Sequence, residues 1–417
     1  MKRLLILGGN PETAGVVLTA KRMGVVTYVV DLVDNSPAKR VSDYSFNGNA
    51  ADIKFLNKII LDNNIDGVLV GVADILVPAY EEVCRLFNFP CYATLTAIKI
   101  FSSKDSFIDS CNRFDLPTIP NYTDNILFDK NIDSIEYPVM VKPVDSGGGV
   151  GMSIAYNYYE MIEAVNKAKL NSKVGRYICE KYIINGQDIQ AYYTIVNGEV
   201  YLSSLVDRTT NKSQGNLSPV CIGAIYNCRF IDLYIETANR KIIDLIKYTK
   251  IKNGVMSIQC FVDDGRIYPY DPGFRLQGEG QHLMLNAVNG FDHREMLINF
   301  ALNKPIWNGD FSKINDLYLK GKSACSVWIL LKSGLISTIS GIDYITKIPA
   351  FMDIMIRFGI NDLVHDSFIG TEKQVFARIY LASDNIIALR ESIELIHSNL
   401  IIRDDQGSNM IVDYFRP

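Results

Sequence analysis

The sequence predicts a multidomain fold in which an N-terminal parallel α/β domain precedes an α+β core and a smaller, strand-rich C-terminal part. Its 417 residues exceed the size of one ordinary domain. Residues 1–92 alternate short apolar strands with amphipathic helices, a pattern typical of a parallel sheet covered on both faces. Residues 93–302 instead contain clustered hairpins, and residues 303–417 carry further strands and a helix.

The elements of the N-terminal domain follow from its apolar runs. Residues 2–7 form a strand that ends at Gly8-Gly9, and a helix continues to about residue 23. The remaining elements are strands at 25–31 and 67–72 and helices at 55–63 and 76–87. A dinucleotide-binding fold with Asp31 on a ribose is an alternative, but the glycines, with Gly15 as the third, do not have the GxGxxG spacing.

The core begins with one predicted helix at 99–114. A strand at 137–143 then leads into the glycine-rich loop Gly147–Gly151, and Asn-Gly and Asp-Gly turns at 197–198 and 264–265 indicate two hairpins. Further core strands are predicted at 152–155, 176–184, 190–196, 200–206, 255–262 and 266–271, with a helix at 158–170. The C-terminal elements are strands at 324–331, 335–340 and 374–382 and a helix at 385–399.

The composition predicts a cytoplasmic protein without a nucleic-acid or membrane partner. Apolar residues make up 48% and charged residues 21% of the chain, with a net charge of −4 and no run of Lys or Arg. The apolar run after Met1-Lys2-Arg3 is too short for a signal peptide, and no later stretch is long enough to span a membrane. The eight cysteines form no CxxC pair and the four histidines are scattered, which argues against a disulfide framework or a zinc site.

The loop Gly147–Gly151 is the first candidate for chemistry. It lies between two strands and lacks the GK[ST] ending of a P-loop, yet its main-chain N–H groups could surround a polyphosphate. A plain flexible hairpin tip is the alternative. Lys142, at the end of the preceding strand, supplies the positive charge that phosphates need. Its replacement by alanine is expected to stop turnover and to leave thermal stability nearly unchanged.

The segment YPVMVKPVDSGGGVGMS at 137–153 resembles the second-lysine strand and phosphate-binding loop of the ATP-grasp superfamily. Lys104 matches the first nucleotide lysine of that family, and residues 179–188 resemble its hinge. The resemblance implies that the Glu180 position and the next backbone amides read adenine, and that Asp188, where the family usually has glutamate, holds the ribose. The implied nucleotide-binding residues are Lys104, Lys142, Ser146, Gly147, Gly148, Gly149, Val150, Glu180, Lys181, Tyr182, Ile183 and Asp188.

The hairpin at 257–275 resembles the magnesium-binding strand pair of the same family. This likeness implies Gln259 and Asp271 as ligands of Mg²⁺, with Mn²⁺ as an alternative ion. Gly273 stands where the family has asparagine. Glu279 is therefore a candidate to assist metal binding through space or through water, the alternative being weaker metal binding.

Three residues are implied in catalysis. Arg275 matches the clamp for the phosphate or acyl phosphate, and Lys142 contributes charge at the loop. Arg208 could bridge the γ-phosphate and the substrate carboxylate, or form a plain salt bridge, and the polar loop at 209–217 behind it is long enough to act as a lid. His282 is a weaker candidate for orienting an amine, the alternative being a loop histidine at a domain edge.

The resemblance implies a preATP-grasp domain at 1–92, an ATP-grasp core at 93–302 and a C-terminal domain at 303–417, as in the branch of biotin carboxylase, carbamoyl-phosphate synthase and L-amino-acid ligase. It further implies a ligase that activates a small-molecule carboxylate with ATP as an acyl phosphate and joins it to an amine. The resemblance implies a role in the biosynthesis of bacterial surface polysaccharides or of amino-acid derivatives. A homodimer is a possible assembly. Two alternatives remain: an ATP-dependent carboxylase that acts through carboxyphosphate, and an ATP-binding protein with reduced turnover.

Overall fold

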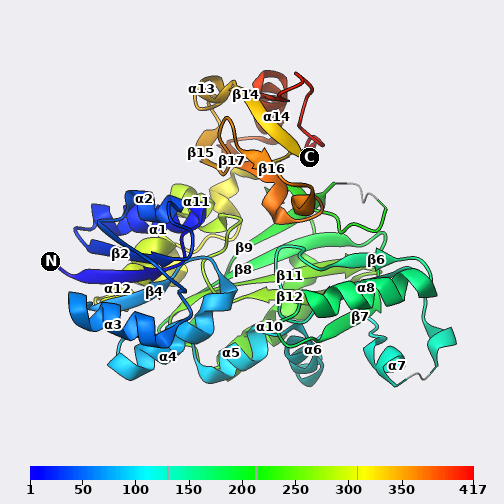
Figure 1. Ribbon diagram of the computed structural model, residues 1–417, viewed down its shortest axis with the longest axis horizontal. Helices are drawn as coiled ribbons and strands as arrows, with labels where there is room; N and C mark the ends of the chain where they lie inside the picture. Colours follow the sequence, from blue (N-terminus) through cyan, green and yellow to red (C-terminus); the bar gives the residue numbers. More distant parts are fainter. Residues whose placement is uncertain (129–130, 212–214, 308) are drawn as a thin grey trace.

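The computed structural model places the described residues in four sheets and confirms the mixed α/β and α+β fold class (Figure 1). The residues described are 1–128, 131–211, 215–307 and 309–417. One sheet is parallel and N-terminal, and the largest is antiparallel and runs through the middle of the chain into its C-terminal part.

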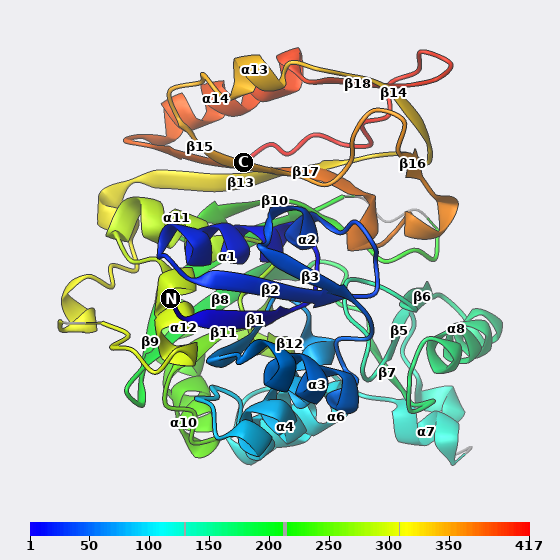
Figure 2. The ribbon, with the colours of Figure 1, turned by 60° about the vertical axis from the view of Figure 1, so that its left-hand side comes forward.

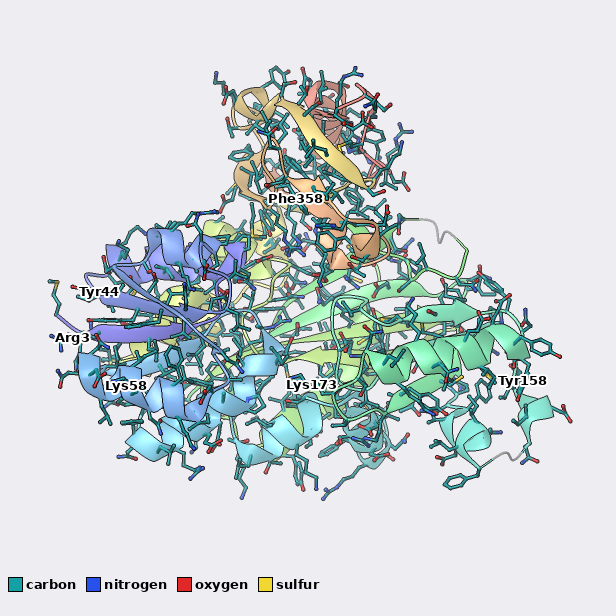
Figure 3. The ribbon with its side chains drawn as sticks, viewed as in Figure 1. Arg3, Tyr44, Lys58, Tyr158, Lys173 and Phe358 are labelled. Atoms are coloured by element: carbon teal, nitrogen blue, oxygen red, sulfur yellow. The ribbon has the colours of Figure 1, made fainter. Side chains whose placement is uncertain are left out.

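The N-terminal sheet has the predicted parallel pairing, in the strand order β3-β2-β1-β4. Its strands are β1 (Arg3–Leu7), β2 (Val26–Asp31), β3 (Tyr44–Asn47) and β4 (Gly67–Val70), and its helices are α1 (Pro11–Arg22), α2 (Pro37–Val41), α3 (Ile53–Asn63) and α4 (Val77–Phe87). Helices α1 and α2 cover one face, and α3 and α4 the other (Figure 2). Strand β3 was not predicted because this edge strand is short and largely exposed, as Tyr44 shows (Figure 3).

The single helix predicted at 99–114 is wrong: the segment forms two helices. They are α5 (Leu95–Phe101) and α6 (Lys104–Arg113), and Ser103 between them is extended. Serine competes for backbone hydrogen bonds and so favours helix ends over helix interiors. The main-chain N–H of Lys104 donates to the carbonyl of Val144 at 2.9 Å. The break therefore fixes the start of α6 beside the glycine loop.

A small antiparallel sheet in the order β6-β5-β7 carries the glycine loop between its first two strands. Its strands are β5 (Val139–Pro143), β6 (Ser153–Ala155) and β7 (Tyr177–Lys181), and the nearby helices are α7 (Thr123–Leu127) and α8 (Tyr158–Leu170). Apolar side chains of α8, such as Met161 and Val165, pack with Val139 and Val141 in a separate small core. The glycine loop is thus mounted on a unit with its own core.

The large sheet has the order β12-β11-β8-β9-β10-β13-β17-β15. Its strands are β8 (Gln187–Val196), β9 (Glu199–Thr210), β10 (Cys221–Tyr226), β11 (Gly254–Asp263), β12 (Arg266–Gly273), β13 (Ser323–Leu330), β15 (Phe351–Ile356) and β17 (Val375–Ser383). The associated helices are α9 (Ile231–Tyr234), α10 (Arg240–Tyr248), α11 (Gln281–Asn289) and α12 (His293–Ala301). Because β10 pairs with β13, the sheet continues across the boundary predicted at residue 302.

The C-terminal part adds a three-stranded sheet in the order β16-β14-β18. Its remaining elements are β14 (Gly334–Ser340), α13 (Ile342–Ile345), β16 (Leu363–Val364), α14 (Ile386–Asn399) and β18 (Ile401–Asp404). Trp328, Phe376 and Leu389 belong to a second apolar core that lies here. Throughout the described part of the chain, every helix falls short of the length and apolarity that a membrane crossing requires.

Candidate functional site

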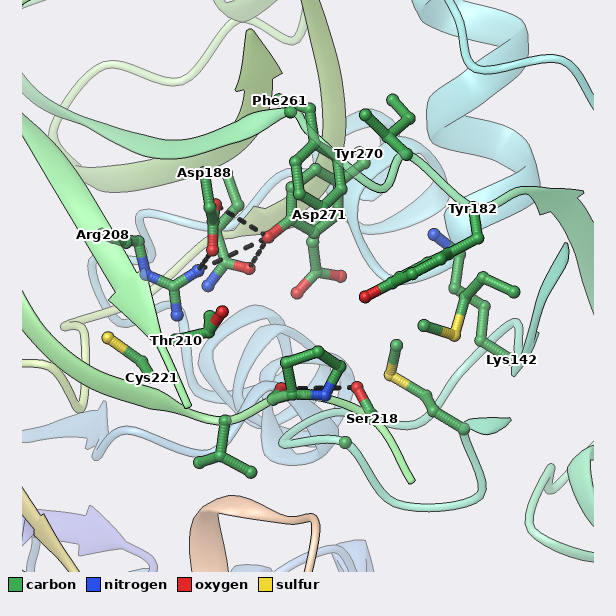
Figure 4. Close-up of a pocket in the computed structure, with 18 of the residues that line it drawn as sticks. Lys142, Tyr182, Asp188, Arg208, Thr210, Ser218, Cys221, Phe261, Tyr270 and Asp271 are labelled. Carbon is green, nitrogen blue, oxygen red and sulfur yellow. Dashed lines mark hydrogen bonds and ion pairs between the residues drawn. The ribbon is translucent and has the colours of Figure 1, made fainter. Parts of the chain in front are cut away.

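A cavity of about 350 Å³ lies where the small sheet, the large sheet and a C-terminal segment meet (Figure 4). It collects most of the site residues predicted from the sequence. Those that line it are Lys104, Lys142, Ser146, Gly147, Gly148, Gly149, Glu180, Lys181, Tyr182, Ile183, Asp188, Arg208, Gln259 and Asp271. Val150 and Arg275 lie outside this lining. The main-chain N–H of Val150 instead closes a turn onto the carbonyl of Gly147 at 3.3 Å.

Part of the cavity wall is apolar. Its members come from both sheets, from the hinge and from two other loops, and they include Ile119, Met140, Met152, Ile184 and Phe261. The ring of Phe261 stacks on that of Tyr270, with 4.5 Å between the centroids. Such a wall suits a flat ring, because apolar and aromatic surface binds an aromatic group without leaving a polar atom unpaired.

Lys142 and Glu180 form a buried ion pair across neighbouring strands of the small sheet. The Lys142 ammonium donates to Glu180 Oε1, and the two residues are 2% and 4% exposed. The same ammonium lies 5.5 Å from the ring centroid of Tyr270. The Glu180 side chain is therefore committed to Lys142, and the N–H groups of Lys181 and Tyr182 in the hinge already donate to main-chain carbonyls.

Lys104 joins three parts of the site. Its ammonium donates to the carbonyl of Ser146 at 2.7 Å and lies 3.0 Å from Asp271 Oδ1. The first residue of α6, the residue before the glycine loop and an acid on β12 thus meet at one point. A cation with an adjacent carboxylate and main-chain amides is an arrangement that can hold phosphate together with a divalent metal ion.

Arg208 lies between two buried carboxylates. Its Nη1 contacts Asp188 Oδ2, and its Nη2 lies 2.9 Å from Glu279 Oε1. The Tyr270 hydroxyl lies 3.1 Å from Asp188 Oδ1 (Figure 4). Burial raises the pKa of both carboxyl groups, and one guanidinium opposes this only in part because it is shared. Of the lid predicted at 209–217, β9 covers the first two residues, and 212–214 lie outside the described residues.

Gln259 and Asp271 face each other across the β11–β12 hairpin, as the sequence predicts for a metal pair. The Gln259 amide is held by the Tyr270 hydroxyl at 2.9 Å and by Glu279 Oε1 at 3.4 Å. Among the described residues, no three Asp, Glu, His or Cys side chains gather into a ready metal cluster. Oxygen donors from Asp271 and Gln259, with Glu279 behind them, fit a hard cation that takes its other ligands from phosphate and water.

The local structure explains why position 273 is a glycine and not an asparagine. A side chain at this position would place its Cβ 2.7 Å from Ser257 Oγ, on the paired strand. That distance is shorter than real Cβ contacts, so asparagine here would require Ser257 to move. Ser257 therefore occupies the space that the side chain of a third metal ligand at position 273 would need.

Arg275 reaches toward the N-terminal domain. Its Nη2 lies 2.6 Å from Asp74 Oδ2, at the start of the short helix η1 (Asp74–Leu76). Although burial opposes the charge, the carboxylate of Asp74 raises the pKa of the arginine. The Arg275 Nε is buried and has no hydrogen-bond partner within the described residues. The guanidinium therefore keeps donor capacity for a further group.

The cavity also contains residues that the sequence did not suggest. Gly370 and Glu372, from the segment between β16 and β17, line it from the C-terminal part. The Glu372 N–H donates to the carbonyl of Gly148 at 3.0 Å. No signal within this segment could have revealed the contact, because its partner lies far away in the sequence.

The two remaining sequence candidates lie elsewhere. The first is Asp31, the candidate for a dinucleotide ribose. A Cβ built on Gly9 would lie 2.1 Å from Ser36 Oγ and 2.7 Å from Asp31 Cγ, so side chains fill the space that a dinucleotide pyrophosphate would need. His282 is buried in α11, and burial lowers its pKa to about 3. It is therefore a neutral imidazole outside the cavity lining.

The chain is similar in sequence to proteins of known families. A family model described as the carbamoyl-phosphate synthase L chain, ATP binding domain, matches residues 103–196. Formate-dependent phosphoribosylglycinamide formyltransferase of Prochlorococcus marinus strain MIT 9301 is 27% identical over 188 residues, which cover 44% of this chain and 48% of that protein. The chain thus spans about half the length of this curated relative.

Two solved structures share the fold along almost the whole chain. L-amino acid ligase from Bacillus licheniformis has a TM-score of 0.78 at 16% identity, covering 97% of this chain and 99% of its own. The biotin carboxylase domain dimer of Hydrogenobacter thermophilus 2-oxoglutarate carboxylase, in complex with MgADP, ADP and bicarbonate, has a TM-score of 0.73 at 14% identity. That match covers 96% of this chain and 91% of the other.

Proposed function

We infer that this chain, which belongs to the ATP-grasp superfamily, uses ATP to activate a carboxylate and then joins the carboxylate to an amine. One observation carries the proposal: Lys104 connects the residue before the glycine loop with Asp271, the proposed metal ligand. Phosphate-binding main chain, a cation and a carboxylate for the metal then surround the same point. This is the end of the cavity where the phosphoryl group is transferred.

In the first step, the substrate carboxylate attacks the γ-phosphorus of ATP. Lys142, Lys104 and the amides of Gly147–Gly149 balance the negative charge on the transferred group. Magnesium, held by Asp271 and Gln259, would neutralise further charge on the phosphate oxygens. Arg275 is proposed to hold the carboxylate and the acyl phosphate with its planar fork.

In the second step, an amine attacks the acyl carbon and phosphate leaves. The loop and the C-terminal segment that contacts it exclude water, which would otherwise hydrolyse the acyl phosphate. No side-chain nucleophile is needed. The reaction thus rests on positioning and charge, and these are what the residues of the cavity provide.

A coupled ADP-release assay tests the proposal. A panel of amino and sugar acids is combined with ATP, magnesium and either hydroxylamine or primary amines, and bicarbonate replaces the amine in parallel. ADP release that requires both a carboxylate and an amine supports the ligase. Release with bicarbonate alone would support the carboxylase alternative, and tight ATP binding without ADP in every mixture would support the alternative of reduced turnover.

Removing the charge of Asp271 tests the metal site. Asp271→Asn is expected to raise the magnesium concentration for half-maximal turnover roughly tenfold and to reduce kcat more than ATP affinity. Asp264→Asn, in the turn of the same hairpin, is the matched control and should behave like the parent. Activity that does not depend on magnesium or manganese in the parent would contradict the assignment.

The glycine loop allows a matched pair of substitutions. Gly148 and Gly149 both have positive φ, at +63° and +81°, so alanine costs each roughly 1–2 kcal/mol of backbone strain. A Cβ on Gly149 would lie 2.9 Å from the carbonyl oxygen of Gly370, whereas on Gly148 the nearest atom is 3.8 Å away. Gly149→Ala is therefore expected to weaken ATP binding, measured by calorimetry, more than Gly148→Ala. Equal losses would show that closure onto Gly370 plays no part.

A further inference from the structure

The segment between β16 and β17 extends from the C-terminal part toward the core (Figure 1), and its residues Gly370 and Glu372 line the cavity. Its Glu372 N–H bonds the carbonyl of Gly148 at 3.0 Å. The Gly370 carbonyl lies so close to Gly149 that a Cβ there would stand 2.9 Å from it. The segment therefore forms the wall of the cavity that faces the glycine loop.

The buried side chain of Arg378 holds the side chain of Glu372 in this wall. Its Oε2 accepts a hydrogen bond of 3.1 Å from Arg378 Nη2. Arg378 is fully buried and also donates to Glu12 Oε1 and to the carbonyl of Gly278, each at 2.8 Å. Arg357 adds a 2.8 Å hydrogen bond to the main-chain carbonyl of Glu372. The position of the carboxylate is thus set by groups of the N-terminal domain, the core and the C-terminal part.

Glu372 is more exposed than the buried carboxylates of the cavity. Glu180 is paired with Lys142, Asp188 with Arg208, and both acids are buried. The Glu372 side chain is 37% exposed, and among the described residues its Oε1 has no partner. Arg378 is ion-paired with Oε2 of Glu372 at 3.1 Å, and Oε1 remains available to a second cation. An ammonium group is the cation that the reaction itself brings.

We propose that Glu372 binds the ammonium group of the amine substrate and accepts its proton. This inference rests on the proposed ligase function. The ammonium loses one proton to the Glu372 carboxylate, and the free nitrogen forms the C–N bond with the acyl carbon. The bond between that carbon and the phosphate oxygen breaks, and the phosphate leaves with the second proton as hydrogen phosphate.

Two kinds of acceptor separate this role from a structural one. Hydroxylamine is uncharged at neutral pH, so it needs neither a carboxylate partner nor a base. The amino groups of alanine and ethylamine are protonated and cationic at that pH. Glu372→Gln keeps the main-chain contact to Gly148 and removes the negative charge, including its ion pair with Arg378. We expect a roughly tenfold or greater rise in KM for the cationic amine, a lower kcat that recovers at higher pH, and hydroxamate formation close to that of the parent.

Asp366→Asn is the matched control, because it removes an exposed carboxylate from the same segment outside the cavity. Equal losses with hydroxylamine and with cationic amines in Glu372→Gln, or no loss with either, would overturn the assignment. So would a parent that accepts hydroxylamine but no cationic amine. If the parent releases no ADP with any pairing of carboxylate and amine, hydroxylamine included, the ligase function itself fails, which is a different result.

Discussion

Replacing Lys142 by methionine is expected to abolish ADP release and to lower the melting temperature at the same time. The first effect follows from the loss of the positive charge beside the transferred phosphoryl group. The second follows from burial: Lys142 is 2% exposed, and its removal leaves the Glu180 carboxylate buried without its partner. Breaking a buried ion pair in this way typically costs about 3–5 kcal/mol.

This result differs from the sequence expectation, in which the strand-terminal lysine could be replaced with little effect on stability. A double variant separates the two effects. Lys142→Met combined with Glu180→Gln removes both charges, so we expect the melting temperature to recover while turnover stays absent. Calorimetric melting and ADP release on the single and double variants measure this. Restored turnover in the double variant would show that Lys142 serves only the fold.

The second large effect is expected at Arg275. Arg275→Lys keeps the charge and should keep ATP affinity, but it should lose roughly tenfold or more in kcat. Lysine is a point charge, whereas the guanidinium can hold two oxygens of the acyl phosphate at once. The guanidinium lies 2.6 Å from Asp74, and its buried Nε has no partner in the described part of the chain.

Asp74→Asn is the control for this variant. It weakens the contact to Arg275 but leaves the guanidinium in place, and the Asp74 side chain is 46% exposed. If Arg275 acts on the substrate, Asp74→Asn should retain most of the turnover that Arg275→Lys loses. If Arg275 only links the N-terminal domain to the core through its ion pair with Asp74, both variants should lower the melting temperature and preserve turnover per folded molecule.

Much of the cavity could be predicted because its parts are local in the sequence. Lys142 and the glycine loop belong to one strand and its following turn, and Gln259 and Asp271 belong to one hairpin. An apolar run, a cluster of glycines or an Asp-Gly turn marks each part in the sequence. The order of the parts along the chain can therefore be predicted without knowledge of the fold. The break at Ser103 escaped this approach because the apolar pattern of α5 continues into α6.

The sequence by itself therefore determined the fold class and most chain segments that build the cavity, but not the segment of Gly370 and Glu372. Only the tertiary structure decided which charges meet: Lys142 with Glu180, Arg208 with Asp188 and Glu279, and Glu372 with Arg378. These contacts join residues that lie in different elements of the fold. The contact of Lys142 with Glu180, for example, depends on the pairing of β5 with β7, and local periodicity and turn residues do not encode that pairing.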